Sequence, residues 1–193
     1  MHRIVTAELD LELSSSVDLI FQVTAAQPAP VVREELTFVQ GDRVYTATEI
    51  VDQSGSRLHR VLAEAGPLEV RYEAVIDGLV AHRATSDLEA ITYLRPMDFH
   101  AVAEAYLDGA WYVIDATRLA NRRSLVRIAT GREAADCAFL SYHGGHVGLD
   151  RMRVDACVVP DTASGLEPHE AEDAAAAASD PALDDFAELV PLA

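Results

Sequence analysis

The sequence predicts a mainly β protein, and three observations support this fold class. Apolar and polar residues alternate with period two through most of residues 4–85, turn signals interrupt the alternation at short intervals, and alternation returns in the second half of the chain. Half of the residues are apolar, which predicts a packed core. Because a sheet with one apolar face buries that face against another layer, we expect a β-sandwich-like domain in residues 1–85.

About seven short strands account for this first domain. The clearest runs from Leu68 to Ile76, where apolar residues alternate with charged ones. Gly41-Asp42 and Asp77-Gly78 are turn dipeptides that end two of the runs. The expected strands cover residues 7–13, 17–23, 36–38, 44–51, 57–63, 68–76 and 79–83.

Residues 86–159 form the second expected unit. Ser86 and Glu89 have the spacing of a capping box and predict a short helix in the connector. The elements expected at the end of the unit are a strand at 125–129, a brief helix from 131 to 139, irregular chain at 142–148 and a strand at 150–159.

Residues 160–193 form an acidic tail. The tail contains nine acidic residues and neither Arg nor Lys. A chain of this composition buries too little apolar surface to fold, so we expect it to be largely disordered. Residues 182–190 place apolar side chains at helical spacing, which is typical of a helical turn that docks on a partner. We prefer the interpretation that the tail is solvated and that these apolar residues are incidental.

The charge of the chain excludes several classes of partner. The formal net charge is −17, and all 15 basic residues are Arg. We therefore expect no nucleic-acid partner and no anionic-membrane partner, because nothing would neutralise the phosphates. Without lysine, the chain supplies no lysine amine to a cross-linking reaction.

The cysteine count and the absence of long apolar runs indicate the cellular compartment of the protein. Cys137 and Cys157 are too few for a disulfide scaffold. The first ten residues lack the apolar segment of a secretory leader, and no apolar run approaches the roughly 20 residues of a membrane span. We therefore expect a cytoplasmic protein with reduced thiols.

The centre of the chain, residues 97–118, predicts a β-hairpin. Asp108-Gly109 is a dipeptide favoured in two-residue hairpin turns because both positions tolerate a positive φ. A turn at this position makes Leu107 and Ala110 partners and fixes the register of the remaining pairs.

This register places His100 and Asp115 on one face of the hairpin. They are diagonal neighbours, about 7–8 Å apart at Cα, and a carboxylate at that distance reaches an imidazole. The pair is able to orient a catalytic histidine, although it is not a catalyst by itself.

The hairpin, with residues 126–139, resembles the C-terminal half of the core of bacterial transglutaminase-like proteins, which are relatives of the papain-like cysteine peptidases. That core ends in a histidine strand of type H-A-x-x-E-x-x-x-x-x-x-W and an aspartate strand of type D-x-T. The matching residues are His100, Ala101, Glu104, Trp111, Asp115 and Thr117.

The resemblance covers roughly residues 1–159. It implies that residues 1–85 are the β-domain that accompanies the core, and that residues 86–159 are a truncated core with a residual antiparallel sheet, the mainly β remainder of an α+β family. It assigns His100 and Asp115 to a Cys-His-Asp triad. It also places Trp111 and Glu104 near the substrate.

The chain departs from the family pattern at the nucleophile. In the family a catalytic cysteine precedes the histidine and starts a helix that packs on this sheet, whereas no cysteine precedes His100 in this sequence. Acyl transfer needs a thiolate beside the imidazole. The resemblance therefore implies a degenerate, non-catalytic protein that binds a peptide, a protein or its own copy, or an internally deleted form of an active enzyme.

The alternative is a thiol-dependent peptidase or acyl transferase that uses Cys137 or a cysteine in trans. Cys137 falls in the expected short helix and Cys157 in an alternating strand, where small half-buried cysteines are common core residues. A reactive Cys137 needs a lowered pKa, and Arg132 is its only nearby cation in the sequence. We prefer the structural interpretation for both thiols.

A metal-binding module is a third hypothesis. His143 and His146 flank two glycines, and Asp150 follows. Because zinc sites usually need a third protein ligand and supporting hydrogen bonds, we interpret the two histidines as exposed loop residues. We expect neither a metal nor another cofactor.

The missing segment also predicts a binding surface. A sheet that has lost its covering helices exposes an apolar face, and contiguous apolar patches usually mark an interaction site. We therefore expect a homo-oligomer through the uncovered face, or close packing of that face on the β-domain.

Overall fold

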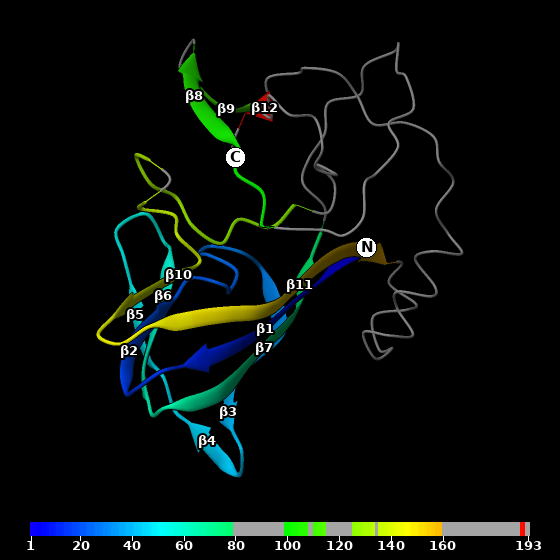
Figure 1. Cartoon of the computed structure of the whole chain (residues 1–193). Helices are drawn as coiled ribbons and strands as arrows, with labels where there is room; N and C mark the ends of the chain where they lie inside the picture. Colours follow the sequence, from blue (N-terminus) through cyan, green and yellow to red (C-terminus); the bar gives the residue numbers. More distant parts are fainter. Residues whose placement is uncertain (79–98, 108–109, 115–124, 134, 160–189, 192–193) are drawn as a thin grey trace.

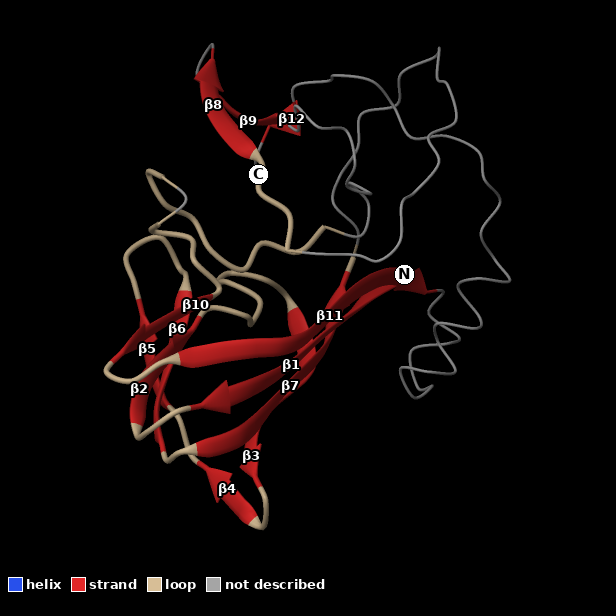
Figure 2. Ribbon diagram, viewed as in Figure 1, coloured by secondary structure: helices blue, strands red, loops and turns tan. Residues whose placement is uncertain are grey.

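The computed structural model describes residues 1–78, 99–107, 110–114, 125–133, 135–159 and 190–191. All regular elements within these residues are β-strands, which confirms the mainly β fold class (Figure 2). Within the same ranges, no helix is long and apolar enough to cross a membrane. The strands are β1 (His2–Leu13), β2 (Val17–Phe21), β3 (Val31–Gln40), β4 (Arg43–Tyr45), β5 (Thr48–Val51), β6 (Arg57–Ala63), β7 (Gly66–Asp77), β8 (Ala103–Leu107), β9 (Ala110–Ile114), β10 (Leu140–His143), β11 (Val147–Val159) and β12 (Val190–Pro191).

The strands form three antiparallel sheets (Figure 1). The first sheet, called sheet A, has the order β11-β1-β7-β3-β4. Sheet B has the order β10-β2-β6-β5, and a small sheet C has the order β12-β9-β8. Side chains from sheets A and B share one hydrophobic core, so these two sheets form the expected sandwich.

The core consists of the apolar positions that alternate along each strand. In β1, Leu9 and Leu11 point inward, and their neighbours Glu8 and Asp10 carry the charges of the outer face. Sheet B contributes Phe21, whose ring lies 5.1 Å from that of Phe38 in sheet A. The other buried members of this cluster include Leu13, Val17, Leu19, Val61, Leu68, Val70 and Ile76.

The last two long strands return to the sandwich. β10 pairs with β2 in sheet B, and β11 pairs with β1 in sheet A along nearly its whole length. Between them, Gly144 and Gly145 take φ angles of 79° and 57°, which residues with a Cβ rarely adopt. Residues 142–148, which were expected to be irregular, therefore contain the tight turn between β10 in sheet B and β11 in sheet A.

This pairing joins residues 140–159 to both sheets of the sandwich. The alternation in the sequence correctly predicted a strand at 150–159, but a local pattern does not show which strand is the partner. The division at residue 85 lies outside the described residues and stays a prediction.

Other expectations are wrong or lie outside the described residues. The helix expected from 131 to 139 is a turn, in which the backbone N–H and Nε of Arg132 donate to Asp136 Oδ2. The strand expected at 125–129 is irregular chain without ladder pairing. The helix near Ser86, the strand at 79–83 and most of the tail are not among the described residues, although Val190–Pro191 pairs with β9.

A polar network joins the two sheets. From β6 in sheet B, the Arg57 guanidinium binds both carboxylate oxygens of Glu34 on β3 in sheet A, at 2.8 and 2.9 Å. Tyr72 on β7 donates to the same carboxylate at 3.0 Å. Burial opposes the ionisation of Glu34, but the hydrogen bonds from Arg57 and Tyr72 outweigh it, and its pKa lies below the usual value.

His59 lies buried beside this network, with 6% of its surface exposed. Its Nε2 is 3.7 Å from Glu49 Oε1, and its Nδ1 has no hydrogen-bond partner in the described structure. Burial lowers the pKa of His59, and the positive charge of Arg57 adds to the effect, while Glu49 and Glu34 oppose it. The folded protein therefore favours the neutral imidazole.

Truncating the inter-sheet aromatic contact tests the sandwich. Phe38→Ala should lower the free energy of unfolding by about 3–5 kcal/mol, because it removes a buried ring and leaves a cavity. Urea denaturation followed by circular dichroism measures the change. Val44→Ala, at an exposed position, should stay within about 0.5 kcal/mol of the parent. Equal effects of the two changes would contradict the assigned core.

The titration of His59 should make stability depend on pH. Because the folded protein holds the pKa of His59 below its ordinary value of about 6.5, the unfolded chain takes up the proton first. The free energy of unfolding should therefore be highest above about pH 6.5 and fall below it. Glu34 contributes separately, below about pH 4.3, where its carboxylate protonates in the unfolded chain.

Urea denaturation between pH 8 and pH 5 measures this loss. His59→Gln should flatten the dependence in that window, whereas His146→Gln, the same change at an exposed histidine, should retain the slope of the parent. The same pH slope in the parent and in His59→Gln would refute the assignment to His59.

Candidate functional site

The central hairpin has the predicted register. Leu107 pairs with Ala110 and Tyr106 with Trp111 in the β8–β9 ladder. The last pair described is Ala103 with Ile114, so the ladder ends before His100 is reached. The turn at 108–109 lies outside the described residues.

His100 lies in irregular chain just before β8 and is half-buried. The residue before it, Phe99, packs against the sandwich core and stacks on Phe139, with ring centroids 5.0 Å apart. The entrance to the hairpin is therefore anchored on the sandwich. Asp115 is outside the described residues, and its proximity to His100 stays a prediction.

The two residues expected near a substrate lie on neighbouring strands of sheet C. Glu104, on β8, forms an ion pair with Arg127. This contact ties the hairpin to the chain that returns to the sandwich, and a role of Glu104 near a substrate stays a prediction. Trp111 lies on β9 opposite Tyr106, and its role at a substrate stays a prediction.

Residues 125–139 form a seam between the hairpin and the sandwich loops. Hydrogen bonds fasten this seam at several points along its length. They run from Arg3 Nη1 to Leu125 O (2.6 Å), Ala26 N to Arg127 O (2.7 Å), Thr130 N to Ser56 Oγ (3.1 Å), Gln22 Nε2 to Asp136 O (3.3 Å) and Gln22 N to Phe139 O (2.9 Å). No local pattern in the sequence marked this segment as a connection.

Cys137 lies in this seam and is half-buried. Gly131 packs so closely that a Cβ there would lie 2.9 Å from the Cys137 Sγ. Burial raises the pKa of the Cys137 thiol, and the carboxylates of Asp136, Asp52 and Glu104 raise it further. A nucleophilic cysteine needs the opposite environment, one that stabilises the thiolate.

Cys157 lies elsewhere, on β11, opposite Ile4 in the ladder. It packs against the small apolar cluster of Ile4, Val75 and Val159. This position fits the structural role expected for a half-buried cysteine.

His143 and His146 are exposed at the corner between β10 and β11. His143 helps to lower the pKa of Asp18, although the hydrogen bonds from Arg60 are the main cause. Among the residues that the structure describes, no three His, Cys, Asp or Glu side chains gather closely enough to hold a metal ion.

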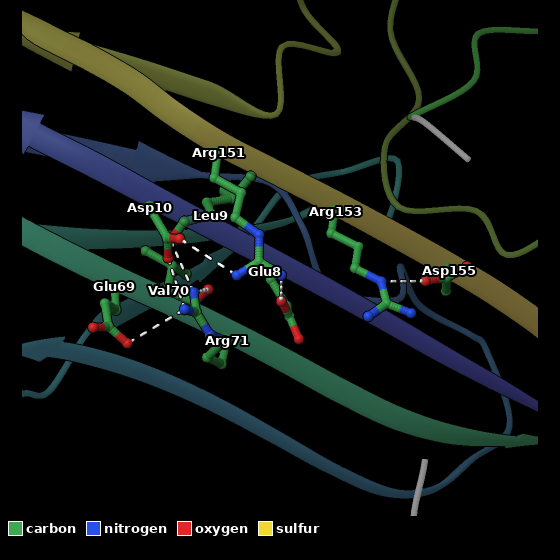
Figure 3. A network of polar contacts seen from close by, with 9 residues as sticks. All are labelled: Glu8, Leu9, Asp10, Glu69, Val70, Arg71, Arg151, Arg153 and Asp155. Carbon is green, nitrogen blue, oxygen red and sulfur yellow. Dashed lines mark hydrogen bonds and ion pairs between the residues drawn. The ribbon is translucent and has the colours of Figure 1, made fainter. Parts of the chain in front are cut away.

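The outer face of sheet A carries cross-strand ion pairs (Figure 3). Arg71 on β7 binds Asp10 on β1 at 2.7 Å, and Arg151 on β11 binds Glu8 on β1 at 3.0 Å. The charged residues that alternate with apolar ones in the sequence predicted that this face of the sheet is exposed to solvent. Solvent-exposed pairs of this kind contribute about 0–1 kcal/mol each, and we interpret them as sheet-stabilising contacts.

Comparison with known proteins defines the fold. No family model and no curated protein matches the sequence. Among solved structures, the chain is similar to a protein from Cytophaga hutchinsonii named a putative cysteine protease, with a TM-score of 0.68 and 19% identity over 83% of this chain and 91% of that one. At this identity the similarity shows a shared fold. It agrees with the cysteine-peptidase-like fold that the sequence resemblance implied.

The environment of Cys137 predicts a slow thiol. In the variant Cys157→Ser, alkylation of Cys137 by iodoacetamide at pH 7 should be slower than that of a free thiol, because its raised pKa leaves little thiolate. The rate should still be rising at pH 9. A rate that reaches its plateau below pH 7 would show an activated nucleophile and contradict this prediction.

Proposed function

We propose that this chain is a non-catalytic binding protein built on a cysteine-peptidase-like fold, a degenerate relative of the transglutaminase-like proteins. The observation that carries the proposal is the surroundings of Cys137, where burial, together with the charge of nearby carboxylates, raises the pKa of the thiol. No cysteine precedes His100 in the sequence, where the resemblance requires the nucleophile.

The chemistry of acyl transfer supports this proposal. The reaction needs a thiolate that attacks a carbonyl and an imidazole that takes and returns the proton. Asp136, Asp52 and Glu104 place negative charge near Cys137, which disfavours the thiolate. Cys157 belongs to a β-ladder of sheet A and packs in its own apolar cluster. The surroundings of Cys137 therefore disfavour a nucleophilic role.

The binding surface of the proposal is the β8–β9 hairpin. Tyr106 is 60% exposed on β8, and Ile114 is exposed on β9. Exposed apolar side chains on an element that has lost its cover favour contact with another polypeptide. The occupant that we propose is a second copy of this chain, in the cytoplasm, where both cysteines stay reduced.

The charge of the protein gives this association a characteristic salt dependence. Two copies, each with a formal net charge of −17, repel one another at low ionic strength. Salt screens this repulsion, so an association carried by apolar contacts should strengthen as salt is added. An association carried by ion pairs would weaken instead.

A charge introduced on the hairpin tests the binding surface. Tyr106→Asp should weaken self-association at least tenfold in sedimentation equilibrium at about 0.15 M salt, because it buries a carboxylate in the interface. Leu62→Asp adds the same charge at a position of similar exposure, 64%, on sheet B, and should match the parent. Equal weakening by both changes, or a parent that stays monomeric at all concentrations, would contradict the proposed surface.

An activity measurement tests the non-catalytic part separately. The purified chain should neither hydrolyse nor transfer acyl groups from glutamine or peptide substrates, and adding a thiol in trans should not change this result. Turnover that is abolished by His100→Ala would favour the alternative of a thiol-dependent enzyme.

A further inference from the structure

Arg3 is a buried cation at one end of sheet A, with 8% of its surface exposed. Its Nε donates to the carbonyl oxygen of Gly78 at 3.0 Å, and its Nη1 donates to the carbonyl oxygen of Leu125 at 2.6 Å. A third contact runs from Nη2 to the carbonyl oxygen of Asp77 at 3.5 Å. One guanidinium therefore joins segments of the chain that are far apart in the sequence.

These carbonyls mark the two ends of one excursion of the chain. Asp77 is the last residue of β7, and Gly78 follows it at the point where the chain leaves sheet A. Leu125 starts the seam on which the chain returns. The hairpin with His100 lies between these ends, so Arg3 holds the exit and the return of the excursion side by side.

Burying the charged guanidinium of Arg3 costs free energy, and the hydrogen bonds to the three carbonyl oxygens offset this cost. Burial lowers the pKa of Arg3 because it disfavours the charged form. The planar guanidinium offers five donors in a fixed fork, which bind several carbonyls at once, whereas the ammonium of a lysine is a compact group on a flexible stem. All three nitrogens of this fork are used at this position, each by a different carbonyl oxygen.

The segment that Arg3 binds at Leu125 is also bound to the hairpin. Two residues after Leu125, the side chain of Arg127 forms its ion pair with Glu104 on β8. The backbone carbonyl of Arg127 accepts a hydrogen bond from Ala26 N at 2.7 Å. The return segment is therefore fixed by Arg3, by the sandwich loop and by the hairpin within three residues.

We infer that Arg3 is a positioning residue that fastens both ends of the His100 excursion to β1 and so holds the β8–β9 hairpin in place on the sandwich. The inference concerns the coupling of these two parts of the chain. It does not depend on whether the hairpin binds a second copy or on whether the protein is catalytic.

Hydrogen exchange measured by mass spectrometry on the full chain tests this role. Arg3→Met keeps an apolar stem of similar length and removes the donors. Peptides covering 99–107 and 125–131 should exchange at least tenfold faster in this variant, while peptides in 68–76 should stay within twofold of the parent. Arg3→Lys should give a smaller increase in the same two regions, because one ammonium replaces the fork.

Arg71→Met provides the matched control. Arg71 also donates to carbonyl oxygens, those of Leu9 and Val70, but its partners all lie within sheet A. It should leave exchange in 99–107 and 125–131 unchanged. If Arg3→Met and Arg71→Met behave alike, or if Arg3→Met speeds exchange equally in all regions, the positioning role is wrong. If Arg3→Met does not fold, Arg3→Lys decides between the same two outcomes.

Discussion

The structure depends on the pairing of β1 with two partners at once. Along its twelve residues, β1 pairs with β7 on one side and with β11 on the other. β7 comes from the first half of the chain and β11 from the second half, so β1 joins two parts of the chain that are far apart in the sequence. Chain far apart in the sequence, near Asp77 and Val159, meets at His2. In the sequence, the His100 hairpin therefore lies between two strands that both pair with β1.

This arrangement separates the scaffold from the candidate site. Sheets A and B bury the apolar core, and the loops at their edges accept the seam formed by residues 125–139. The seam brings Glu104, Asp52 and Asp136 close enough to Cys137 to act on its thiol. Burial and these carboxylates both disfavour the Cys137 thiolate. The chain thus shares its fold with a solved structure named a putative cysteine protease, while its Cys137 lacks the surroundings that activate a thiol.

Much of the fold could be predicted from the sequence because strands and turns are local. Alternation located the long strands, and the Asp-Gly dipeptide gave the correct partner for Leu107 in the hairpin. The return of β11 to β1 could not be predicted, because every alternating strand offers a similar apolar face. The helix expected at 131–139 was wrong because contacts outside the segment, such as those from Gln22, hold it as a turn. The role of Arg3 also rests on partners distant in the sequence, and nothing local marks it.

The surroundings of His100 decide the central claim, which is that this fold has kept a histidine and lost its nucleophile. Crystallography with anomalous scattering from sulfur measures the point most directly, since it locates every Sγ atom relative to the imidazole ring. The account predicts that neither Cys137 nor Cys157 places its sulfur within about 4 Å of a His100 ring nitrogen, the reach of a thiol hydrogen bond. A sulfur at hydrogen-bonding distance from that ring would contradict it.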